Sequence, residues 1–258
     1  MNKLTILIPS LKQPKQIGFL QKATSSIRNQ SIANDFAITI LVGVDKNCAL
    51  DPNICNMLGL SCIESEGHSR AKALNSAIKH IDSEFVAFLE DDDQWMPDYL
   101  KFAMHALSFC DFVSSTQAEF NEADEFIRVN DFPTPSGWCM PLDTLKKVGY
   151  FNEDFIHHQD SEWLGRLNEK RVRRVHLVES TIDIDEKNIA RLRPKLMNVI
   201  NFSNENCSFM NHHSSDPLVK RLVHTNSGMS LIAADRKHAD ISRAESSKLK
   251  NMFGKIPW

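Results

Sequence analysis

The sequence predicts an α/β domain with a mainly parallel central sheet flanked by helices, followed by a short C-terminal helical extension. Strand-like apolar runs alternate with helix-like segments over residues 4–108, as in α/β layers. Polar or acidic residues follow each of these runs. The 258 residues are 42% hydrophobic and 24% charged, a globular composition in a chain long enough to bury a full core. We expect one domain over residues 1–232 and a basic helix or tail over residues 233–258.

The alternation comes from three apolar runs and the amphipathic segments between and after them. Short runs rich in β-branched and aromatic residues predict buried strands. They are Leu4–Ile8, Phe36–Val44 and Phe85–Leu89. Apolar residues at helical spacing, with a proline opening the third segment, predict helices. They are Ile17–Gln30, Ser69–Ile81 and Pro97–Ser108.

This order places the residues after the strands at one edge of the sheet. Successive strands joined by helices run parallel, and ligands bind beyond their carboxyl ends. Pro9, Asp45 and the four acids Glu90–Asp93 follow the three strands. We therefore expect them to lie together.

The second half of the chain is less regular. The pattern predicts a loop over residues 132–138 and no internal repeats. The expected strands are Phe112–Ser115 and Arg173–Val178, and the expected helices are Leu142–Val148, Asp160–Glu169, Pro194–Phe202 and Ala233–Lys250.

Charge and hydropathy exclude several classes of protein. With 30 Lys and Arg against 33 Asp and Glu, the net charge is −3, so no basic surface for nucleic acid is expected. The apolar runs fall short of the roughly 20 residues that a membrane helix needs. No secretory h-region precedes Pro9, which favours a cytoplasmic protein. The six cysteines show no C-x-x-C pair, and we expect free thiols.

The strongest chemical signal is the run Glu90–Asp93 directly after a buried strand. Adjacent carboxylates repel one another unless a cation or a helix N-terminus offsets their charge. Mg²⁺ and Mn²⁺ prefer oxygen ligands, commonly carboxylates together with substrate phosphates. The cluster therefore suits a metal ion that bridges to a diphosphate. The alternative is a solvated acidic turn in which Asp93 caps the next helix.

At these residues the sequence resembles family 2 glycosyltransferases, which have the nucleotide-sugar-binding GT-A fold. Leu89–Pro97 is similar to the metal-binding D-x-D segment of that family. The remaining matches keep the order of the family's motifs across residues 4–230. They are Leu4–Pro9, Ser26–Ser31, Val42–Asp45, Gly67–Asn75, Val148–Glu153, Gln159–Trp163 with Arg166, and Arg221, His224 and Ser227.

The resemblance implies an inverting, metal-dependent transfer of a sugar from a nucleoside-diphosphate sugar to a hydroxyl of a glycan, lipid or other acceptor, as in polysaccharide biosynthesis. Asp160 is then the catalytic base. Mn²⁺ or Mg²⁺ is expected on Glu90, Asp92, Asp93 and His224. Donor contacts are expected from Pro9, Asp45, Arg70, Lys72, Asn75, Asp91 and Asp92, and acceptor contacts from Trp138, Gln159 and Trp163.

Three positions depart from the family pattern. Glu90 stands in place of the first Asp of the D-x-D, Gln159 in place of the Glu before Asp160, and Lys46-Asn47 in place of a common Asp-Gly. Glu90 keeps its charge with a longer reach, and Gln159 loses a charge but keeps an acceptor oxygen. Both substitutions are tolerable for metal binding and acceptor choice, and the loop on the diphosphate side is expected to differ from that of the family.

Several of these site residues also have a purely structural alternative role. Asp160 can serve as a helix cap, Asp45 as a turn former, Arg70 and Lys72 as solvated helix charges, His224 as a structural histidine, and Trp138 and Trp163 as core residues. The basic segment 236–258, which ends in Trp258, suits either a membrane surface or a solvated helix.

Two other functions compete with sugar transfer. An Asp nucleophile in the Asp91-x-Asp93 spacing indicates a phosphotransferase, but Trp95 occupies the place of the small residue which that pattern needs. A non-catalytic nucleotide-sugar-binding module of the same fold is the second alternative.

Overall fold

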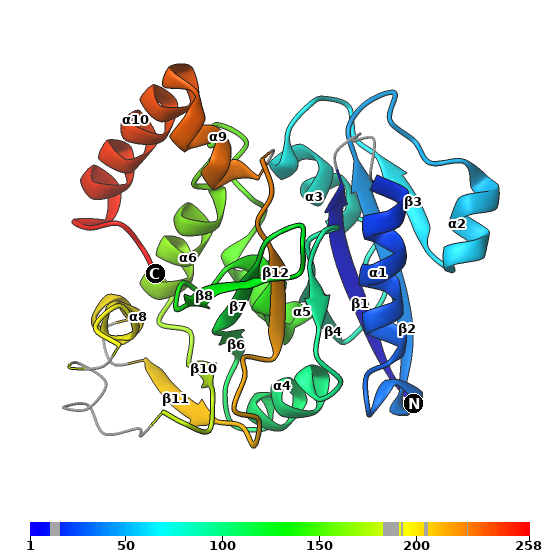
Figure 1. Cartoon of the computed structure of the whole chain (residues 1–258), viewed down its shortest axis with the longest axis horizontal. Helices are drawn as coiled ribbons and strands as arrows, with labels where there is room; N and C mark the ends of the chain where they lie inside the picture. The colour runs from blue at the N-terminus through cyan, green and yellow to red at the C-terminus, as the bar shows by residue number, and fades with distance from the viewer. Residues whose placement is uncertain (11–15, 183–190, 192, 204–205, 226) are drawn as a thin grey trace.

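Two sheets form the framework of the protein, seen in Figure 1. The computed structural model describes residues 1–258 except 11–15, 183–190, 192, 204–205 and 226. The larger sheet has eight strands in the order β11-β10-β6-β9-β4-β1-β2-β3, and the smaller has four in the order β5-β12-β7-β8. Helices cover the larger sheet, so the predicted α/β class with a central sheet is confirmed.

The larger sheet is parallel except at β9, which runs antiparallel to both β4 and β6. The expected first strand is longer than predicted, because Pro9 and Ser10 still pair with β2. The strands are β1 (Asn2–Ser10), β2 (Phe36–Val44), β3 (Ser61–Glu64), β4 (Phe85–Phe88), β6 (Phe112–Ser115), β9 (Cys139–Pro141), β10 (Arg174–Val178) and β11 (Cys207–Asn211).

Alternate residues of β1 face two different cores, as the two-residue period of a strand requires. Leu4, Ile6 and Ile8 pack in a core with α1 (Gln16–Arg28) and α4 (Tyr99–Leu107). On the other face, Leu7 packs with α3, α5 and α6. These helices span Arg70–Ile78, Leu142–Val148 and Gln159–Glu169.

A glycine on β2 lets α3 approach the sheet closely. A Cβ atom built at Gly43 would lie 2.3 Å from the carbonyl oxygen of Ala73. No side chain fits in that gap. The contact fixes the start of α3, and with it Arg70 and Lys72, against the end of the strand that carries Asp45.

The smaller sheet closes over the carboxyl end of β4. Its strand β12 runs parallel to β7 and antiparallel to β5. The pairing brings residues near position 220 beside the acidic turn at 90–93, which no local sequence pattern indicates. The strands are β5 (Gln94–Trp95), β7 (Gln117–Phe120), β8 (Phe126–Asn130) and β12 (Val219–Leu222).

The C-terminal region differs from the prediction of one helix over Ala233–Lys250. It forms α9 (Gly228–Ala234) and α10 (Arg236–Phe253), separated by Asp235. The Asp235 carboxylate accepts a hydrogen bond from the backbone N–H of Lys237 and so begins a new helix. The expected boundary at 232/233 lies within α9.

Other helices agree with their predictions to within a few residues. Residues 194–202 were expected to be helical, and α8 spans Leu196–Ser203. The helix expected to open at Pro97 starts later, at Tyr99, with Asp98 at its N-cap position. A helix that was not predicted, α2 (Pro52–Leu58), follows the Asp51 cap. The short 3-10 turns are η1 (Ala33–Asp35) and η2 (Pro135–Gly137).

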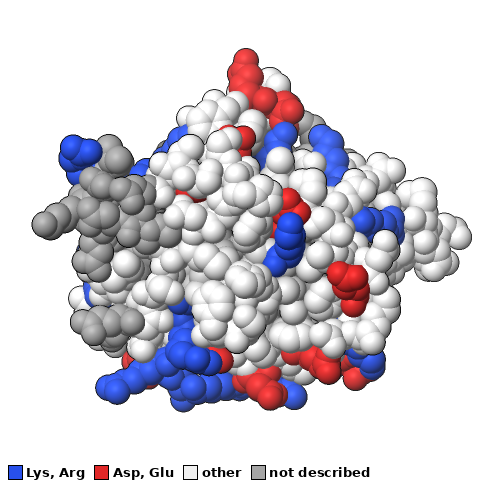
Figure 2. Space-filling model, turned by 90° about the horizontal axis from the view of Figure 1, so that it is seen from below, with Lys and Arg blue, Asp and Glu red and all other residues white. Residues whose placement is uncertain are grey.

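The structure also shows the state of the cysteines, the character of the helices and the charge on one face. All six cysteines are free, as expected. Among the described residues, none of the helices combines the length and the apolar character needed to cross a membrane. The face in Figure 2 is mostly uncharged, and its charged side chains of both signs are scattered over it and more numerous along its lower border.

Candidate functional site

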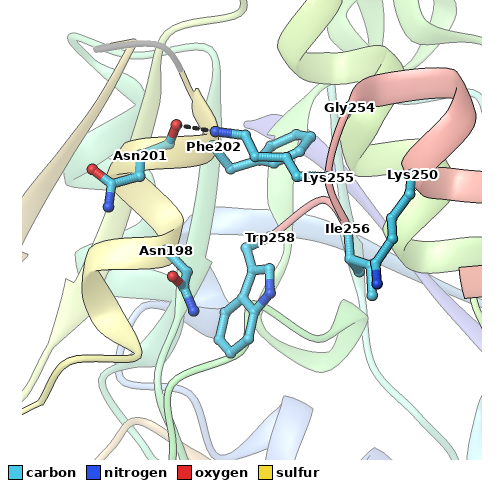
Figure 3. A pocket seen from close by; sticks show the side chains of 8 residues that line it. All are labelled: Asn198, Asn201, Phe202, Lys250, Gly254, Lys255, Ile256 and Trp258. Carbon is cyan, nitrogen blue, oxygen red and sulfur yellow. Dashed lines mark hydrogen bonds between the residues drawn. The ribbon is translucent and has the colours of Figure 1, made fainter.

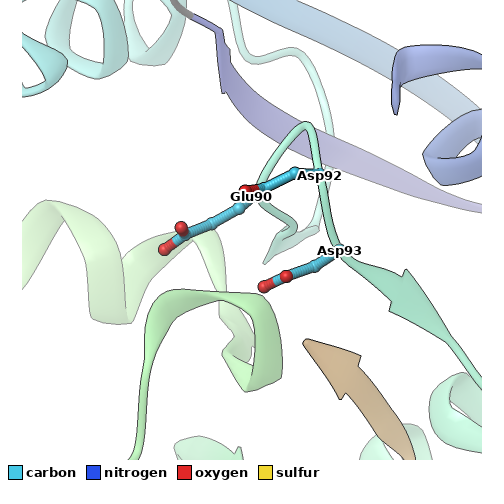
Figure 4. Close-up of side chains that lie close together, drawn as sticks. All are labelled: Glu90, Asp92 and Asp93. Carbon is cyan, nitrogen blue, oxygen red and sulfur yellow. The ribbon is translucent and has the colours of Figure 1, made fainter. Parts of the chain in front are cut away.

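Three carboxylates converge on the turn that follows β4. Figure 4 shows Glu90, Asp92 and Asp93 leaving this turn. One carboxylate oxygen of each lies within 4.8 Å of the others. Three oxygen donors so close together suit a hard divalent ion. The residues expected from the sequence as carboxylate ligands are therefore brought together.

Each of these carboxylates is also held by a neighbour from a different element. Glu90 forms an ion pair with Arg70 of α3. Asp92 lies 2.9 Å from Nε2 of His224, and this hydrogen bond raises the pKa of the imidazole. His224, the second residue after β12, thus lies beside the cluster, as expected.

Asp93 is the most buried member of the cluster, with 1% of its surface exposed. Burial, and then the negative charge of Asp92, raises the pKa of Asp93 well above its ordinary value. Its Oδ2 accepts a hydrogen bond from the Ser136 hydroxyl at 2.5 Å, and its Oδ1 accepts one from the backbone N–H of Leu222 at 3.0 Å. Asp93 therefore ties the acidic turn to η2 and to β12.

Ser136 is a site residue that the sequence did not indicate. Its hydroxyl oxygen accepts the backbone N–H of Glu90 at 3.1 Å while it donates to Asp93. Its carbonyl accepts the indole N–H of Trp95 at 2.6 Å. One fully buried serine thus fixes the acidic turn at two points and β5 at a third. The P-T-P-S-G loop gave no chemical motif that would have marked it.

Asp91 is bound to the end of β1 and is not one of the three converging carboxylates. Its carboxylate accepts a hydrogen bond from the Ser10 hydroxyl, which in turn accepts one from the Gln16 side chain at 2.7 Å. Burial, followed by the Asp92 charge, raises the pKa of Asp91 to about 7. Its expected contact with a donor remains a prediction. What the structure shows is a link between the turn and the end of β1.

Asp45 lies at the end of β2, where the sequence placed it. Burial raises the pKa of its carboxyl group. Oδ2 lies 3.8 Å from Nδ1 of His68. Within the part of the chain that the structure describes, Oδ1 is buried without a hydrogen-bond partner. Pro9 is buried in β1 next to Gly43.

The start of α3 brings two cations to this edge. The Ser69 hydroxyl accepts the backbone N–H of Lys72 at 3.1 Å and caps the helix. The Lys72 side chain lies over Gly67, where an added Cβ would be 2.9 Å from Nζ. Arg70 faces Glu90, and its positive charge is further favoured by Asp160 and Asp92.

Asp160 lies in the first turn of α6, across Arg70 from Glu90. Its Oδ1 accepts the backbone N–H of Ser161 at 2.7 Å. The helix already begins at Gln159 with His158 as its N-cap residue, so the alternative that Asp160 is simply the cap is wrong. Burial raises the pKa of Asp160, and the Arg70 guanidinium opposes that rise. Arg70 therefore links the acidic turn to the residue expected to act as a base.

Both tryptophans expected to contact an acceptor are core residues, and that prediction is wrong. Trp138 and Trp163 are fully buried and stack with ring centroids 5.0 Å apart. Their indole N–H groups donate to the carbonyls of Pro133 at 2.7 Å and Gly149 at 2.9 Å. A fully enclosed ring has no face free for a sugar.

The expected role of Asn75 as a donor contact is also wrong. Its amide donates to the Phe151 carbonyl at 2.9 Å and to Glu153 at 3.0 Å, and its Oδ1 accepts the Phe151 N–H at 2.9 Å. It is a buried strut between α3 and the loop before α6. Gln159 is 5% exposed, with its Oε1 unpaired among the described atoms.

A hollow of about 510 Å³ adjoins the acidic site through His224. Its other walls include the turn of the β7–β8 hairpin and two residues of α9, Ser230 and Ala234. A second, of about 330 Å³, lies away from the acids between α8 and the C-terminal segment, and Figure 3 shows Trp258 and Lys255 at its wall.

A family model described as glycosyl transferase family 2 matches residues 5–166, the stretch from β1 to the Arg166 of α6. The chain belongs to this family. The match includes the acidic turn, Asp45, Arg70 and Asp160, and the resemblance drawn from the sequence is confirmed.

Individual relatives agree with the family. The chain is 30% identical over 181 residues to the succinoglycan biosynthesis protein ExoW of Rhizobium meliloti, covering 61% of this chain and 53% of that protein. It thus spans about half the length of that relative.

Solved structures of S. aureus TarS share the fold. A complex with UDP has a TM-score of 0.54 at 14% identity, over 98% of this chain and 72% of that one. A complex with UDP-GlcNAc has a TM-score of 0.53 at 12% identity, over 98% of this chain and 73% of that one. The GT-A fold expected from the sequence is confirmed.

Proposed function

We propose that this chain is an inverting, metal-dependent glycosyltransferase that moves a sugar from a nucleoside-diphosphate sugar to a hydroxyl group of a glycan or lipid-linked acceptor. The observation that carries the proposal is the set of three carboxylates next to Arg70 and Asp160, at the carboxyl edge of the sheet. Family membership supports sugar transfer, and the arrangement of charges supports the finer chemistry.

The donor set fits Mn²⁺ or Mg²⁺. Glu90, Asp92 and Asp93 offer only oxygen atoms, the ligands that these ions prefer. They are the residues that would hold the ion, with His224 beside Asp92. When bound, the ion supplies a positive charge for the diphosphate. Such a charge would also favour the ionised form of Asp93, whose pKa is raised by burial and by the charge of Asp92.

The donor site extends from Asp45 toward the acidic turn. The unpaired Oδ1 of Asp45 is suited to accept a hydrogen bond from a nucleobase edge. Lys72 and Arg70, at the N-terminal end of α3, are suited to bind phosphate oxygens. Because the TarS neighbours were solved with UDP and UDP-GlcNAc, we propose a uridine nucleotide as the first donor to test.

Asp160 serves as the general base. As the acceptor oxygen forms its bond to the anomeric carbon, its proton moves to the Asp160 carboxylate, and the bond from that carbon to the diphosphate oxygen breaks with inversion. Burial raises the pKa of Asp160 and makes it a better proton acceptor. The hydrogen bond from the backbone N–H of Ser161 to Oδ1 orients the carboxylate without using both oxygens.

The acceptor is proposed to be a growing glycan, since ExoW is named for succinoglycan biosynthesis. We also propose that the protein works in the cytoplasm, where the exposed basic face of α10 contacts an anionic membrane surface. That face carries Arg236, Lys237 and Arg243. Changing these three to Gln should reduce co-sedimentation with anionic vesicles. Unchanged partitioning would end this part of the proposal.

The test is a panel of UDP-, GDP- and dTDP-sugars assayed for nucleotide release in Mn²⁺. Asp160→Asn should abolish turnover and leave nucleotide affinity near that of the wild type. Asp143→Asn, at a side chain that is 94% exposed, is the matched control and should remain active. Turnover that survives in Asp160→Asn contradicts the base. Nucleotide binding without any turnover in the wild type favours a binding module instead.

A further inference from the structure

Helix α10 presents one continuous stripe of side chains to the loop before α6. His238, Ser242, Glu245, Leu249 and Phe253 are spaced four, three, four and four residues apart, so they share one face of a helix. Leu249 is fully buried. The Phe253 ring lies against α6, where a Cβ at Gly165 would be 2.4 Å from it. In Figure 1, α10 lies beside α6.

Glu245 is the polar centre of this stripe. Its carboxylate accepts three backbone N–H groups in a row, from Ile156 at 2.5 Å, His157 at 2.9 Å and His158 at 3.0 Å. The residue is 6% exposed. A buried carboxylate that accepts several backbone N–H groups forms strong hydrogen bonds and fixes the segment that donates them.

Two more contacts join the same segment to α10. Nδ1 of His238 lies 3.0 Å from Nε2 of His157. The Ser242 hydroxyl lies 2.8 Å from Nε2 of His158. Helix α10 thus holds both the side chains and the backbone of residues 157 and 158. The segment 156–158 is fixed from one side by a helix that lies about 80 residues later in the chain.

The held segment leads directly into the candidate base. His158 is the N-cap residue of α6, and Asp160 lies in the first turn of that helix. Any shift of residues 156–158 would move the start of α6 and change the distance from Asp160 to the groups around Arg70. A displacement of about 1 Å in a reacting group can reduce the rate by about 10²-fold.

We propose that Glu245 is a positioning residue for Asp160, and that α10 is a working part of the acceptor side of the site. This inference rests on the proposed role of Asp160 as the base. The positioning role explains why residue 245 is a carboxylate. The three backbone N–H groups that it binds are all donors, and a carboxylate is purely an acceptor. A glutamine would turn a donor amide toward at least one of those N–H groups.

The test compares Glu245→Gln with Asp240→Asn, the same change of carboxylate to amide at an exposed position of the same helix. Hydrogen exchange of the amides of Ile156, His157 and His158 reports the contact directly. Release of nucleotide from the panel donor that the wild type hydrolyses fastest reports function, and calorimetry with the corresponding nucleoside diphosphate in Mn²⁺ reports the donor site.

For Glu245→Gln we expect the three amides to exchange at least about tenfold faster, and kcat to fall by about 10²-fold. Nucleotide affinity should stay within about twofold of the wild type, since Glu245 contacts none of the donor-side residues. Asp240→Asn should match the wild type in all three measurements. Glu245→Asp, which keeps both acceptor oxygens, should recover part of the lost kcat, and it replaces Glu245→Gln if that variant does not fold.

Faster exchange with unchanged kcat would overturn the positioning role and leave the proposed function intact. Unchanged exchange would overturn the contact itself. Equal losses of kcat and nucleotide affinity would show a general structural role, which also overturns the inference. Failure of the proposed function is separate, because it would appear as activity retained in Asp160→Asn.

Discussion

Replacing Ser136 by alanine tests how the acidic turn is held. The hydroxyl of Ser136 donates to Asp93 and accepts from the backbone N–H of Glu90, and the residue is fully buried. Alanine removes both hydrogen bonds and leaves no room for water to replace them. The turn keeps its link to Leu222 and the contact of Trp95 with the carbonyl of residue 136.

The size of the effect follows from these contacts. A hydrogen bond to a charged group contributes about 1.5–3 kcal/mol, and an unpaired buried N–H costs about 1–3 kcal/mol. Because both losses come from one hydroxyl group, we take the low end of each range for Ser136→Ala. The free energy of unfolding should fall by about 2.5 kcal/mol. Loss of a donor disfavours the ionised Asp93, so nucleotide affinity in Mn²⁺ should fall about tenfold or more.

Urea unfolding in chelator and calorimetric titration of UDP in Mn²⁺ measure the two effects. Ser108→Ala is the matched control, because the Ser108 hydroxyl donates to the carbonyl of His105 at an exposed position. This control should change stability by less than about 0.5 kcal/mol. If Ser136→Ala changes neither stability nor nucleotide affinity more than Ser108→Ala does, the reasoning about the turn is refuted.

Three further predictions concern the packing of Trp163, the pH dependence of stability and the hydrogen bonds of Asn75. Trp163→Ala should lower the free energy of unfolding, measured in urea, by about 3–5 kcal/mol. If Trp163 instead bound the acceptor, the substitution would raise KM and leave the stability unchanged. Burial, with the charge of Arg174, lowers the pKa of His176 to about 3. The unfolded chain therefore binds a proton that the folded one excludes, and this group alone should lower stability by about 2 kcal/mol between pH 7.5 and pH 5. His212, whose pKa burial lowers to about 4, adds to the fall over the same range. In His176→Asn the fall should be smaller by about 2 kcal/mol, and an identical pH profile would contradict it. Asn75→Ala should speed hydrogen exchange at the amide of Phe151, which donates to Asn75. Unchanged exchange would contradict the role of Asn75 in holding this loop.

Much of the fold follows from the sequence because the first strands and helices are long and periodic. The residues of β2 and α5 match their predicted ranges from end to end. The strands β3, β5, β7, β8, β9, β11 and β12 were not predicted, since two to five residues carry little periodicity. The places of β5, β9 and β12 depend on pairing with distant strands, which no local pattern contains.

The site was predictable where its residues follow strands. Glu90, Asp92, Asp93 and His224 meet as expected. Trp138, Trp163 and Asn75 were misjudged for one physical reason, because a motif identifies a residue without showing whether its side chain faces solvent or the core. Ser136 and Glu245 were missed because each acts through backbone amides of a segment far away in sequence.

The central claim is that the acids after β4 hold a divalent ion that binds a diphosphate. Calorimetric titration of UDP, GDP and dTDP in Mn²⁺ and in chelator, with wild type and Asp92→Ala, tests it most directly. The account predicts that the wild type binds at least one of the three about tenfold or more tightly in Mn²⁺, and that Asp92→Ala loses this gain while matching the wild type in chelator. Equal affinity with and without Mn²⁺ in the wild type would contradict it.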